Sequence, residues 1–437
     1  MVTKKWWPAA AMLLTVCSLA ACSGGEKKEE ARPAENRPKE PVTLTIYDPN
    51  AKADPALFME NYGNAIQKKF PYITVKYISS PDTSPETHIE NRIAAGEPID
   101  IMFNVGSINH YRLISTFKLE YDMTGLIKST GYDLSRLEPS AVKAVQDFSK
   151  GGMYAFPYRM VVSGMMYNKD LFDKFGKAYP KDNMTWDETY ELAKTMTRVE
   201  GGTQYRGFIT QFETASQNQL SVPFVDPKTD KALLNTDERW SRFVKNWTRF
   251  YEIPGNMSKE NDFGSINNLF VKDKVAAMYA YNLPATQLDV NWDVVTLPEF
   301  SDRRGIGPQS LLTLVYVTST SKHKEAAFDA ISVLTSDEVQ MHLAKKALAF
   351  PVINNQAVKD AYGQEATFLQ GKNVRALLKN KPADPIPASP YHRYASAAFG
   401  KYMYHLSKGT VDVNTALRTM TEEADKEIEK AKAPAGK

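Results

Sequence analysis

Strand-like and helix-like patterns alternate between residues 42 and 105, and this alternation restricts the possible folds more than any other feature. Strand-like segments alternate polar side chains with aliphatic or β-branched ones, while helix-like segments place apolar side chains at helical spacing. Strands are expected at 42–47, 73–78 and 99–105, and helices at 57–69 and 86–95. Pro71 and Gly96 end the two helices. This order predicts an α/β fold that begins with a parallel sheet and has helices on both faces.

Polar and small residues follow two of these predicted strands. Ligands of open α/β sheets bind beyond the carboxyl ends of the strands. The rule selects five positions for a candidate site: Asp48, Asn50, Asn104, Gly106 and Ser107.

The N-terminus has the pattern of an export signal. Lys4 and Lys5 precede a mostly apolar run over residues 6–20, which is too short for a lasting transmembrane helix. The run ends in Leu-Ala-Ala-Cys at 19–22, which resembles the lipobox of bacterial lipoproteins. We therefore expect residues 1–22 to act as a lipoprotein signal peptide, with Cys22 as the lipidated residue. An ordinary secretory signal that ends in a cysteine by chance is the alternative.

Residues 23–40 are polar, charged and interrupted by two prolines, so we expect a disordered tether. An anchor followed by a tether predicts a protein that is held at the extracytoplasmic face of the bacterial cell membrane. Both cysteines, Cys17 and Cys22, lie in the signal region, which excludes a disulfide or a thiolate metal site in the body.

Composition argues against several classes of function. The net charge is only +3, and no basic block with interleaved aromatic residues indicates nucleic-acid binding. The six histidines show no metal-ligand spacing, and there is no P-loop, dinucleotide loop or nucleophile elbow. We therefore expect no metal, no cofactor and no enzymatic activity. A glycoside hydrolase or lyase stays open, because paired carboxylates cannot be recognised from sequence.

Seven sequence blocks, in order along the chain, resemble those of the family 1 extracellular solute-binding proteins, the sugar-type receptors of ABC importers. The blocks are 93–101 (IAAGEPIDI), 152–158 (GMYAFPY), 166–172 (MYNKDLF), 184–188 (MTWDE), 270–278 (FVKDKVAAM), 319–327 (STSKHKEAA) and the helix-like 409–428. Many of these residues also have a structural explanation: Thr185 and Glu188, for example, are spaced as a helix capping box.

The resemblance implies a periplasmic-binding-protein type II fold, with two α/β lobes, a ligand cleft between them and crossover strands as a hinge. Lobe 1 would comprise 41–159 plus 301–335, and lobe 2 would comprise 160–300 plus 336–437. The first crossover would lie near residues 158–160. Closure of such lobes around a ligand is a hinge motion.

The resemblance also suggests a set of ligand-binding positions. Aromatic rings suit the apolar faces of a sugar, and polar side chains suit its hydroxyl groups. The candidates are Tyr47, Asp48, Asn104, Ser107, Tyr158, Arg159, Tyr279, Tyr281, Asn282, Tyr391, Arg393 and Tyr394, with His392 beside the last three. The chain has Tyr281-Asn282 where many relatives carry a tryptophan platform, which leaves open a different sugar or a ligand that is not a sugar.

The implied function is a monomeric, lipid-anchored receptor that captures an oligosaccharide or sugar derivative and delivers it to the permease subunits of an ABC importer. Two alternatives stay open at this point: a receptor of the same fold for a peptide or polyamine, and a surface carbohydrate-active enzyme.

Overall fold

A computed structural model describes residues 40–50, 53–81, 84–211, 218–257, 265–284 and 286–433. The predicted signal peptide, Cys22 and all but the last residue of the predicted tether lie outside this range. No helix within it is long and apolar enough to cross a membrane.

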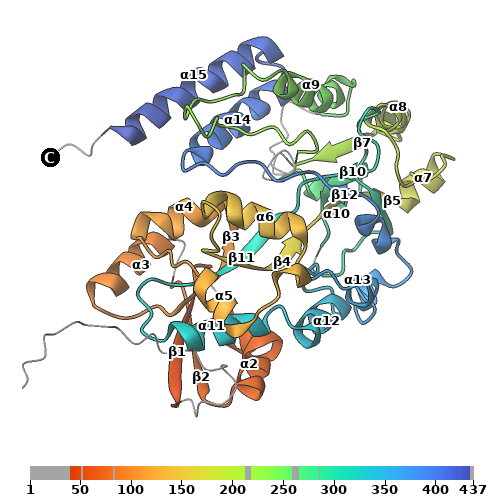
Figure 1. Ribbon diagram of the computed structural model, residues 1–437. Helices are drawn as coiled ribbons and strands as arrows, with labels where there is room; N and C mark the ends of the chain where they lie inside the picture. Colours follow the sequence, from red (N-terminus) through yellow and green to blue (C-terminus); the bar gives the residue numbers. More distant parts are fainter. Residues whose placement is uncertain are drawn as a thin grey trace, which may run out of the picture. The chain divides into compact units, whose positions relative to one another are not determined.

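The first sheet contains five strands in the order β2-β1-β3-β11-β4 (Figure 1). They are β1 (Val42–Asp48), β2 (Ile73–Ser79), β3 (Ile101–Gly106), β4 (Phe156–Val161) and β11 (Leu311–Val317). β1 pairs in parallel with β2 and β3, which confirms the predicted parallel opening, whereas β11 pairs antiparallel with β3 and β4. The parallel strands end together, so Asp48 and the end of β3 lie at one edge of the sheet.

Helices cover both faces of this sheet. They include α1 (Pro55–Phe58), the π-helical η2 (Met59–Gly63), α2 (Asn64–Lys69), α3 (Pro85–Ala94), α5 (Thr124–Thr130), α6 (Pro139–Phe148) and α11 (Lys324–Val333). Strand alternation assigns the faces. Tyr47 contacts His88 of α3, while Tyr77 of the neighbouring strand stacks on Phe58 of α1.

The second sheet also contains five strands, in the order β6-β7-β8-β5-β9. They are β5 (Ser163–Asn168), β6 (Arg198–Glu200), β7 (Thr203–Thr210), β8 (Ala276–Asn282) and β9 (Trp292–Thr296). The helices that surround it are α7 (Lys169–Lys174), α8 (Trp186–Met196), α9 (Glu238–Glu252), α10 (Asn268–Val271), α14 (His392–Ser407) and α15 (Val413–Lys432). A short pair, β10 (Ile306–Gly307) and β12 (Lys381–Pro382), forms a separate ribbon.

The chain moves between the two sheets at Val162, the single residue between β4 and β5. It returns between Phe300, which packs in the core of the second sheet, and Leu312, which packs in the core of the first. It leaves again after Val358. The first of these passages lies two residues beyond the 158–160 segment that the resemblance suggested for the first crossover.

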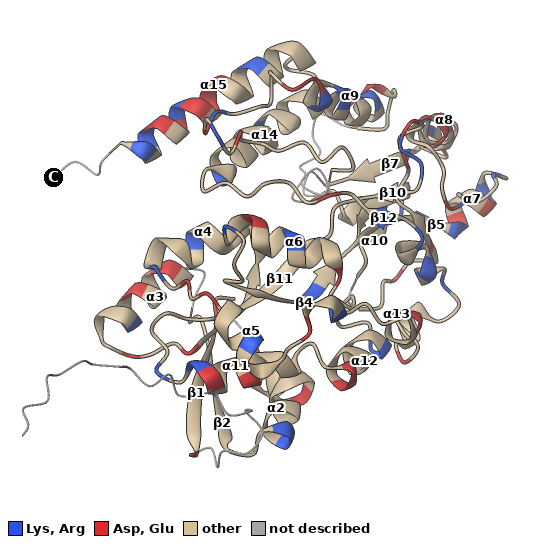
Figure 2. Ribbon diagram, viewed as in Figure 1, with Lys and Arg blue, Asp and Glu red and all other residues tan. Residues whose placement is uncertain are grey.

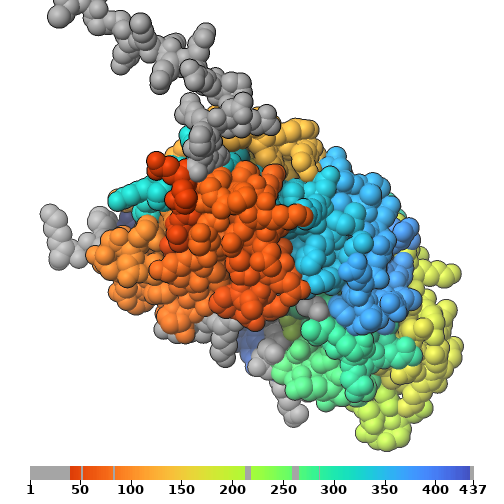
Figure 3. Space-filling view, turned by 90° about the horizontal axis from the view of Figure 1, so that it is seen from below, coloured from red at the N-terminus to blue at the C-terminus, as the bar shows by residue number. Residues whose placement is uncertain are grey.

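The segment after α11 packs with the first sheet. α12 (Asp337–Lys345) buries Val339 and Leu343 in the first core, and α13 (Gln356–Asp360) buries Val358 there. On the surface, α12 lies beside the helices that follow β1 (Figure 3), where Lys68 pairs with Glu338 at 2.8 Å. We therefore propose that lobe 1 extends to about residue 358, beyond the boundary at 335 that the sequence suggested.

Two motif blocks have structural roles. Thr185 Oγ1 accepts a hydrogen bond from the Glu188 amide at 3.1 Å, and the Glu188 carboxylate accepts one from the Thr185 amide at 2.7 Å, so the predicted capping box is confirmed. Asp100 is buried and accepts from the Thr45 amide and the Ser321 hydroxyl at 2.9 and 2.7 Å. It therefore joins β1, the start of β3 and the segment before α11.

Candidate ligand-binding cleft

A buried carboxylate lies at the carboxyl edge of the first sheet. Asp48 is 1% exposed and accepts four hydrogen bonds. The Asn50 amide and side chain donate at 2.8 Å each, the Tyr77 hydroxyl at 2.7 Å and the Asn104 side chain at 3.0 Å. Burial and the Asp48 charge raise the pKa of Tyr77, so its phenol keeps the proton that it donates.

Asn104 extends this network to the first crossover strand. Its side-chain oxygen accepts from Arg159 Nη2 at 2.7 Å and from the Tyr158 hydroxyl at 3.3 Å. Arg159 Nε in turn donates to the Thr313 hydroxyl of β11 at 3.1 Å. Three of the sequence-derived candidates, Asp48, Asn104 and Arg159, therefore form one connected group although they are far apart in the sequence.

A polar cavity of about 280 Å³ opens beside this group. It is lined by Pro49, Asn50, Asn104, Val105, Gly106, Asn109, Arg112, Leu113, Arg159 and Thr313. The polar lining consists of amide and guanidinium groups that can donate hydrogen bonds, together with the Thr313 hydroxyl. Its position agrees with the rule that ligands bind beyond the strand ends.

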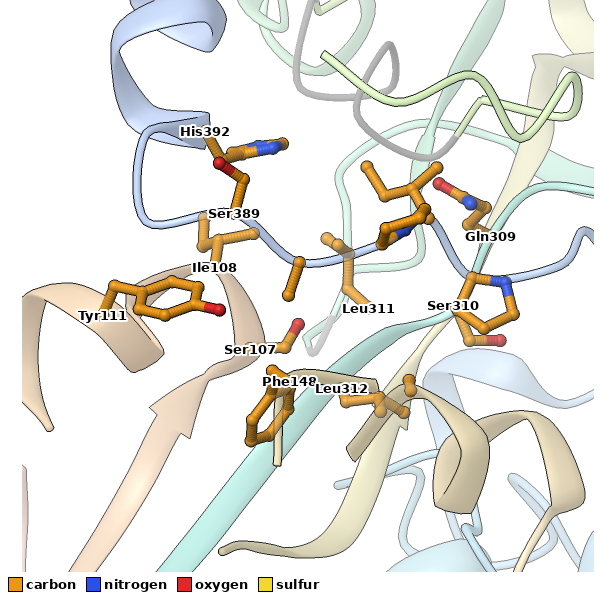
Figure 4. A pocket seen from close by; sticks show the side chains of 15 residues that line it. Ser107, Ile108, Tyr111, Phe148, Gln309, Ser310, Leu311, Leu312, Ser389 and His392 are labelled. Carbon is orange, nitrogen blue, oxygen red and sulfur yellow. The ribbon is translucent and has the colours of Figure 1, made fainter. Parts of the chain in front are cut away.

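A second cavity, of about 120 Å³, is mostly apolar. Figure 4 shows its walls: Tyr111 of α4 (His110–Leu113) and Phe148 of α6 lie on one side, and Ser389 and His392 lie on the other. The strand β11 contributes Leu311 and Leu312. The remaining lining residues are Ser107, Ile108, Ala144, Gln309, Ser310 and 385–388.

A third cavity, of about 340 Å³, is lined by the predicted aromatic cluster. Its lining includes Tyr391, His392, Arg393 and Tyr394 from the start of α14, and Ile108, Asn109, Tyr111, Arg112, Ser115, Thr116, Ser389, Pro390 and Ala431. Arg393 Nη2 donates to the Tyr394 hydroxyl at 2.6 Å, and its guanidinium lies 4.6 Å from the centre of the same ring.

The three cavities adjoin one another. Asn109 and Arg112 line both the first and the third, while Tyr111 and His392 line both the second and the third. We call the three together the cleft. One wall comes from residues 104–116 of the first-sheet region, and the facing wall comes from residues 385–394, which lead into α14.

Four of the sequence-derived candidates lie elsewhere. Tyr47 is fully buried, with its hydroxyl 3.1 Å from His88 Nδ1. Tyr279 and Tyr281 stack on each other in β8 with ring centres 5.5 Å apart, and Asn282 accepts from the Ser163 hydroxyl at 2.8 Å. None of the four lines the cleft. The remaining candidates, Ser107, Tyr158, Tyr391, Arg393 and Tyr394, line it or belong to its hydrogen-bonded floor.

Sequence reasoning missed the wall formed by Ile108, Tyr111 and Arg112. This part of the chain forms a short 3₁₀ turn and the four-residue helix α4, which is too short to produce a periodic pattern. The facing segment, 385–390, has the sequence Pro-Ile-Pro-Ala-Ser-Pro. Its three prolines predict an extended loop, and this signal could have identified the facing wall from the sequence.

No group of three or more metal-ligating side chains occurs in the part of the chain that the structure describes. His392 is half-buried in the cleft, and burial lowers its pKa to about 4, so its imidazole is neutral at pH 7. The geometry provides hydrogen-bond donors and aromatic faces for holding a ligand.

Comparison with known proteins places the chain in a known group. A family model described as bacterial extracellular solute-binding protein matches residues 49–341. A diacetylchitobiose-binding protein of Streptomyces coelicolor is 22% identical over 329 residues, which cover 68% of this chain and 67% of that protein.

Solved structures agree with the fold. An ABC substrate-binding protein of Listeria monocytogenes, in complex with cycloalternan, superposes with a TM-score of 0.68 at 18% identity and covers 89% of this chain and 99% of its own. Maltose-bound MalE3 of T. maritima superposes with a TM-score of 0.64 at 18% identity and covers 88% and 99%. The predicted type II periplasmic-binding-protein fold is therefore confirmed.

Proposed function

Because the chain belongs to the bacterial extracellular solute-binding protein family, we propose that it captures a sugar or oligosaccharide in the cleft and delivers it to the permease of an ABC importer. The observation that carries this proposal is the composition of the cleft. Its floor offers fixed hydrogen-bond donors around Asn104 and Arg159, and its rim offers the rings of Tyr111, Tyr391 and Tyr394. Sugars need both kinds of surface.

The ligands of the similar proteins support the same proposal. The Streptomyces coelicolor relative is a diacetylchitobiose-binding protein, and the two similar structures contain cycloalternan and maltose. The Leu-Ala-Ala-Cys sequence at 19–22 supports the further proposal that Cys22 carries a lipid that holds the receptor at the outer face of the cell membrane.

Binding without chemistry is the expected behaviour. The family consists of solute-binding proteins. Among the residues that the structure describes, Asp48 is the carboxylate in the hydrogen-bonded floor of the cleft, and it already accepts four hydrogen bonds. A general acid and its partner would need two accessible carboxyl groups. A receptor for a peptide or polyamine is the alternative within the same fold.

Thermal unfolding against a ligand panel tests the proposal. A ligand that binds only the folded protein stabilises it by about 2.7 kcal/mol at a hundredfold excess over its dissociation constant, so the midpoint must rise. We expect a rise with one or more saccharides, and chromatography should recover the saccharide unchanged. A rise with a peptide or polyamine alone would contradict the sugar assignment, and breakdown of the saccharide would contradict the receptor role.

A matched pair of variants locates the site. Tyr391→Ala should weaken saccharide binding by about 1 kcal/mol, the worth of an aromatic contact, which is roughly a fivefold loss of affinity. Tyr404→Ala removes an exposed tyrosine from α14 that does not line the cleft, and it should leave the affinity unchanged. Equal affinities for the two variants would place the ligand elsewhere.

A further inference from the structure

The described lining of the cleft has an unequal charge composition. Arg112, Arg159 and Arg393 line it, and no aspartate or glutamate of the described residues does. The chain as a whole is nearly balanced, with 54 Lys+Arg and 51 Asp+Glu. Basic residues lie on α4 and at the start of α14 in Figure 2, which are the two walls of the cleft. The excess of positive charge is therefore local.

Arg159 is held in place without being neutralised. Its Nε and Nη2 donate to the neutral oxygens of Thr313 and Asn104 at 3.1 and 2.7 Å. Its Nη1 makes no hydrogen bond to any described residue. Asp48 lies behind Asn104 and makes its own hydrogen bonds with other groups, so Arg159 forms no ion pair within the described chain. A guanidinium fixed in this way is oriented for an incoming acceptor.

The other two arginines differ in their partners. Arg112 Nη1 donates to Glu86 at 2.8 Å, and both side chains are partly exposed to water, which weakens the compensation. Arg393 bonds only the neutral Tyr394 hydroxyl among the residues described. Arg112 lines the first cavity together with Arg159, and it lines the third cavity together with Arg393.

A guanidinium carries five donors and no acceptor. A neutral sugar presents hydroxyl groups that both donate and accept, and a cleft for it would gain from carboxylate acceptors in its lining. The Asn104 side-chain oxygen is already occupied by Arg159 and Tyr158. The three arginines add charged donors and no acceptors, while the acceptors in the described lining are neutral amide and hydroxyl oxygens without a carboxylate. This composition matches a ligand that carries an acceptor-rich, negatively charged group.

We propose that the ligand is an anionic saccharide, and that its acid group binds in the polar cavity between Arg112 and Arg159 while Arg393 attracts it from the facing wall. The inference rests on the proposed function and adds the charge of the ligand to it. Carboxylate and phosphate groups share the required chemistry, since each accepts paired hydrogen bonds from arginine.

Calorimetric titration of the full-length protein in detergent tests the proposal. The probes are oligogalacturonates, the same oligomers as neutral methyl esters, and hexose phosphates beside the parent hexoses. We expect the acid form to bind at least about tenfold more tightly than its neutral match, with affinity that falls as salt is added. Tighter binding of the phosphates than of the uronates would assign the acid group to phosphate.

Variants connect the effect to the cleft. Arg112→Gln and Arg393→Gln should each lower the affinity for the acidic ligand by about tenfold to a hundredfold, which is the range for the loss of a hydrogen bond to a charged group. Arg418→Gln, on the exposed side of α15, is the matched control and should change nothing. Neither cleft variant alters the buried Arg159 network, so both should fold.

The results that would contradict the anionic assignment differ from those that would contradict the sugar assignment. If neutral oligosaccharides bind as tightly as the acidic ones, the anionic assignment is wrong and the sugar receptor stands. If simple dicarboxylates bind as tightly as the acidic saccharides, the sugar part of both proposals is wrong. If no probe binds, or if Arg418→Gln weakens binding as much as the cleft variants do, the assignment of the acid group to this cleft is overturned.

Discussion

Asn104 has a backbone φ of 58°, in the left-handed region that asparagine enters more readily than most residues. From this position its side chain joins Asp48 to Arg159, which make no direct ion pair. One amide thus separates a buried carboxylate from a guanidinium and leaves the guanidinium available to the cleft. Asn104 therefore leaves the positive charge of Arg159, and not the negative charge of Asp48, facing the cleft.

Replacement of this residue should be costly. Asn104→Ala removes the acceptor of Arg159 and a donor to Asp48, and it places alanine at a positive φ, so the free energy of unfolding should fall by about 3 kcal/mol. Asn183 has a φ of 63° but no side-chain hydrogen bond among the described residues. Asn183→Ala should therefore cost only about 1 kcal/mol in urea unfolding. Equal losses would show that the network contributes nothing.

His110 makes stability depend on pH. Its ring is buried against Phe148 with centres 4.3 Å apart, and Nδ1 lies 3.2 Å from the Tyr316 hydroxyl. Burial lowers the pKa of His110 from 6.5 to about 4, although the Glu120 charge opposes the change. The unfolded state takes up the proton first as the pH falls below 6.5. Stability should therefore decline between pH 6.5 and 4, by about 3 kcal/mol at most.

Urea unfolding at several pH values checks this dependence. His110→Gln should flatten the decline between pH 6.5 and 4, whatever its effect at pH 7. His392 has a pKa lowered to about 4 by burial and should account for part of the slope that is left. His323→Gln alters an exposed histidine and should leave the curve parallel to that of the unaltered protein. A His110→Gln curve parallel to it would contradict the assignment.

At the scale of elements, α8 and β7 approach each other closely because Gly207 has no side chain. A Cβ atom at this position would lie 2.0 Å from the Ala193 carbonyl oxygen, which is backbone and cannot move aside. The Gly207 amide also donates to the Thr197 hydroxyl at 2.9 Å, at the end of α8. The backbone of β7 therefore lies directly against the helix at Gly207.

Gly207→Ala should destabilise the second sheet by about 3 kcal/mol, the upper range for overpacking a core. Gly125→Ala is the matched control, since a Cβ in that helical position meets nothing within 4 Å. It should be neutral or stabilise by about 0.5–1 kcal/mol, because alanine favours helix. Thermal unfolding distinguishes the two, and a Gly207→Ala protein as stable as the unaltered one would contradict the close approach.

At the scale of the whole molecule, the cleft joins residues of the first-sheet region to residues that lead into α14, and the chain crosses between the sheets at Val162. Ligand that contacts both walls should favour the closed arrangement of the lobes, because a ligand shifts an equilibrium toward the state that it binds better.

Closure can be measured with two fluorescent labels. The chain has two cysteines, Cys17 and Cys22, and their replacement by serine gives a cysteine-free background for labelling. Lys128→Cys on α5 and Lys245→Cys on α9 then provide exposed labelling positions on the two lobes. We expect energy transfer between the labels to change when a bound saccharide is added. A pair on one lobe, Lys128→Cys with Lys143→Cys, should show no change, and identical behaviour of both pairs would exclude a hinge.

The amino-acid sequence alone determined those structural elements that depend on interactions between residues close together in the chain. The strands at 42–47 and 73–78, the parallel opening and the Thr185 capping box follow from side-chain alternation and short-range hydrogen bonds, so they could be predicted. The ordered motif blocks also identified the family. Asp48, Asn104 and Arg159 were found because strand ends and a crossover are visible in sequence.

Only the tertiary structure decided which side chains share the cleft. Tyr47 and Asp48 are neighbours in sequence, yet strand alternation buries Tyr47 beneath α3 and turns Asp48 toward the network. Arg112 joins Arg159, and Arg393 faces them, because β11 and the segment before α14 return to the sheet edge from more than a hundred residues away. Such proximity depends on long-range packing, which no local pattern encodes.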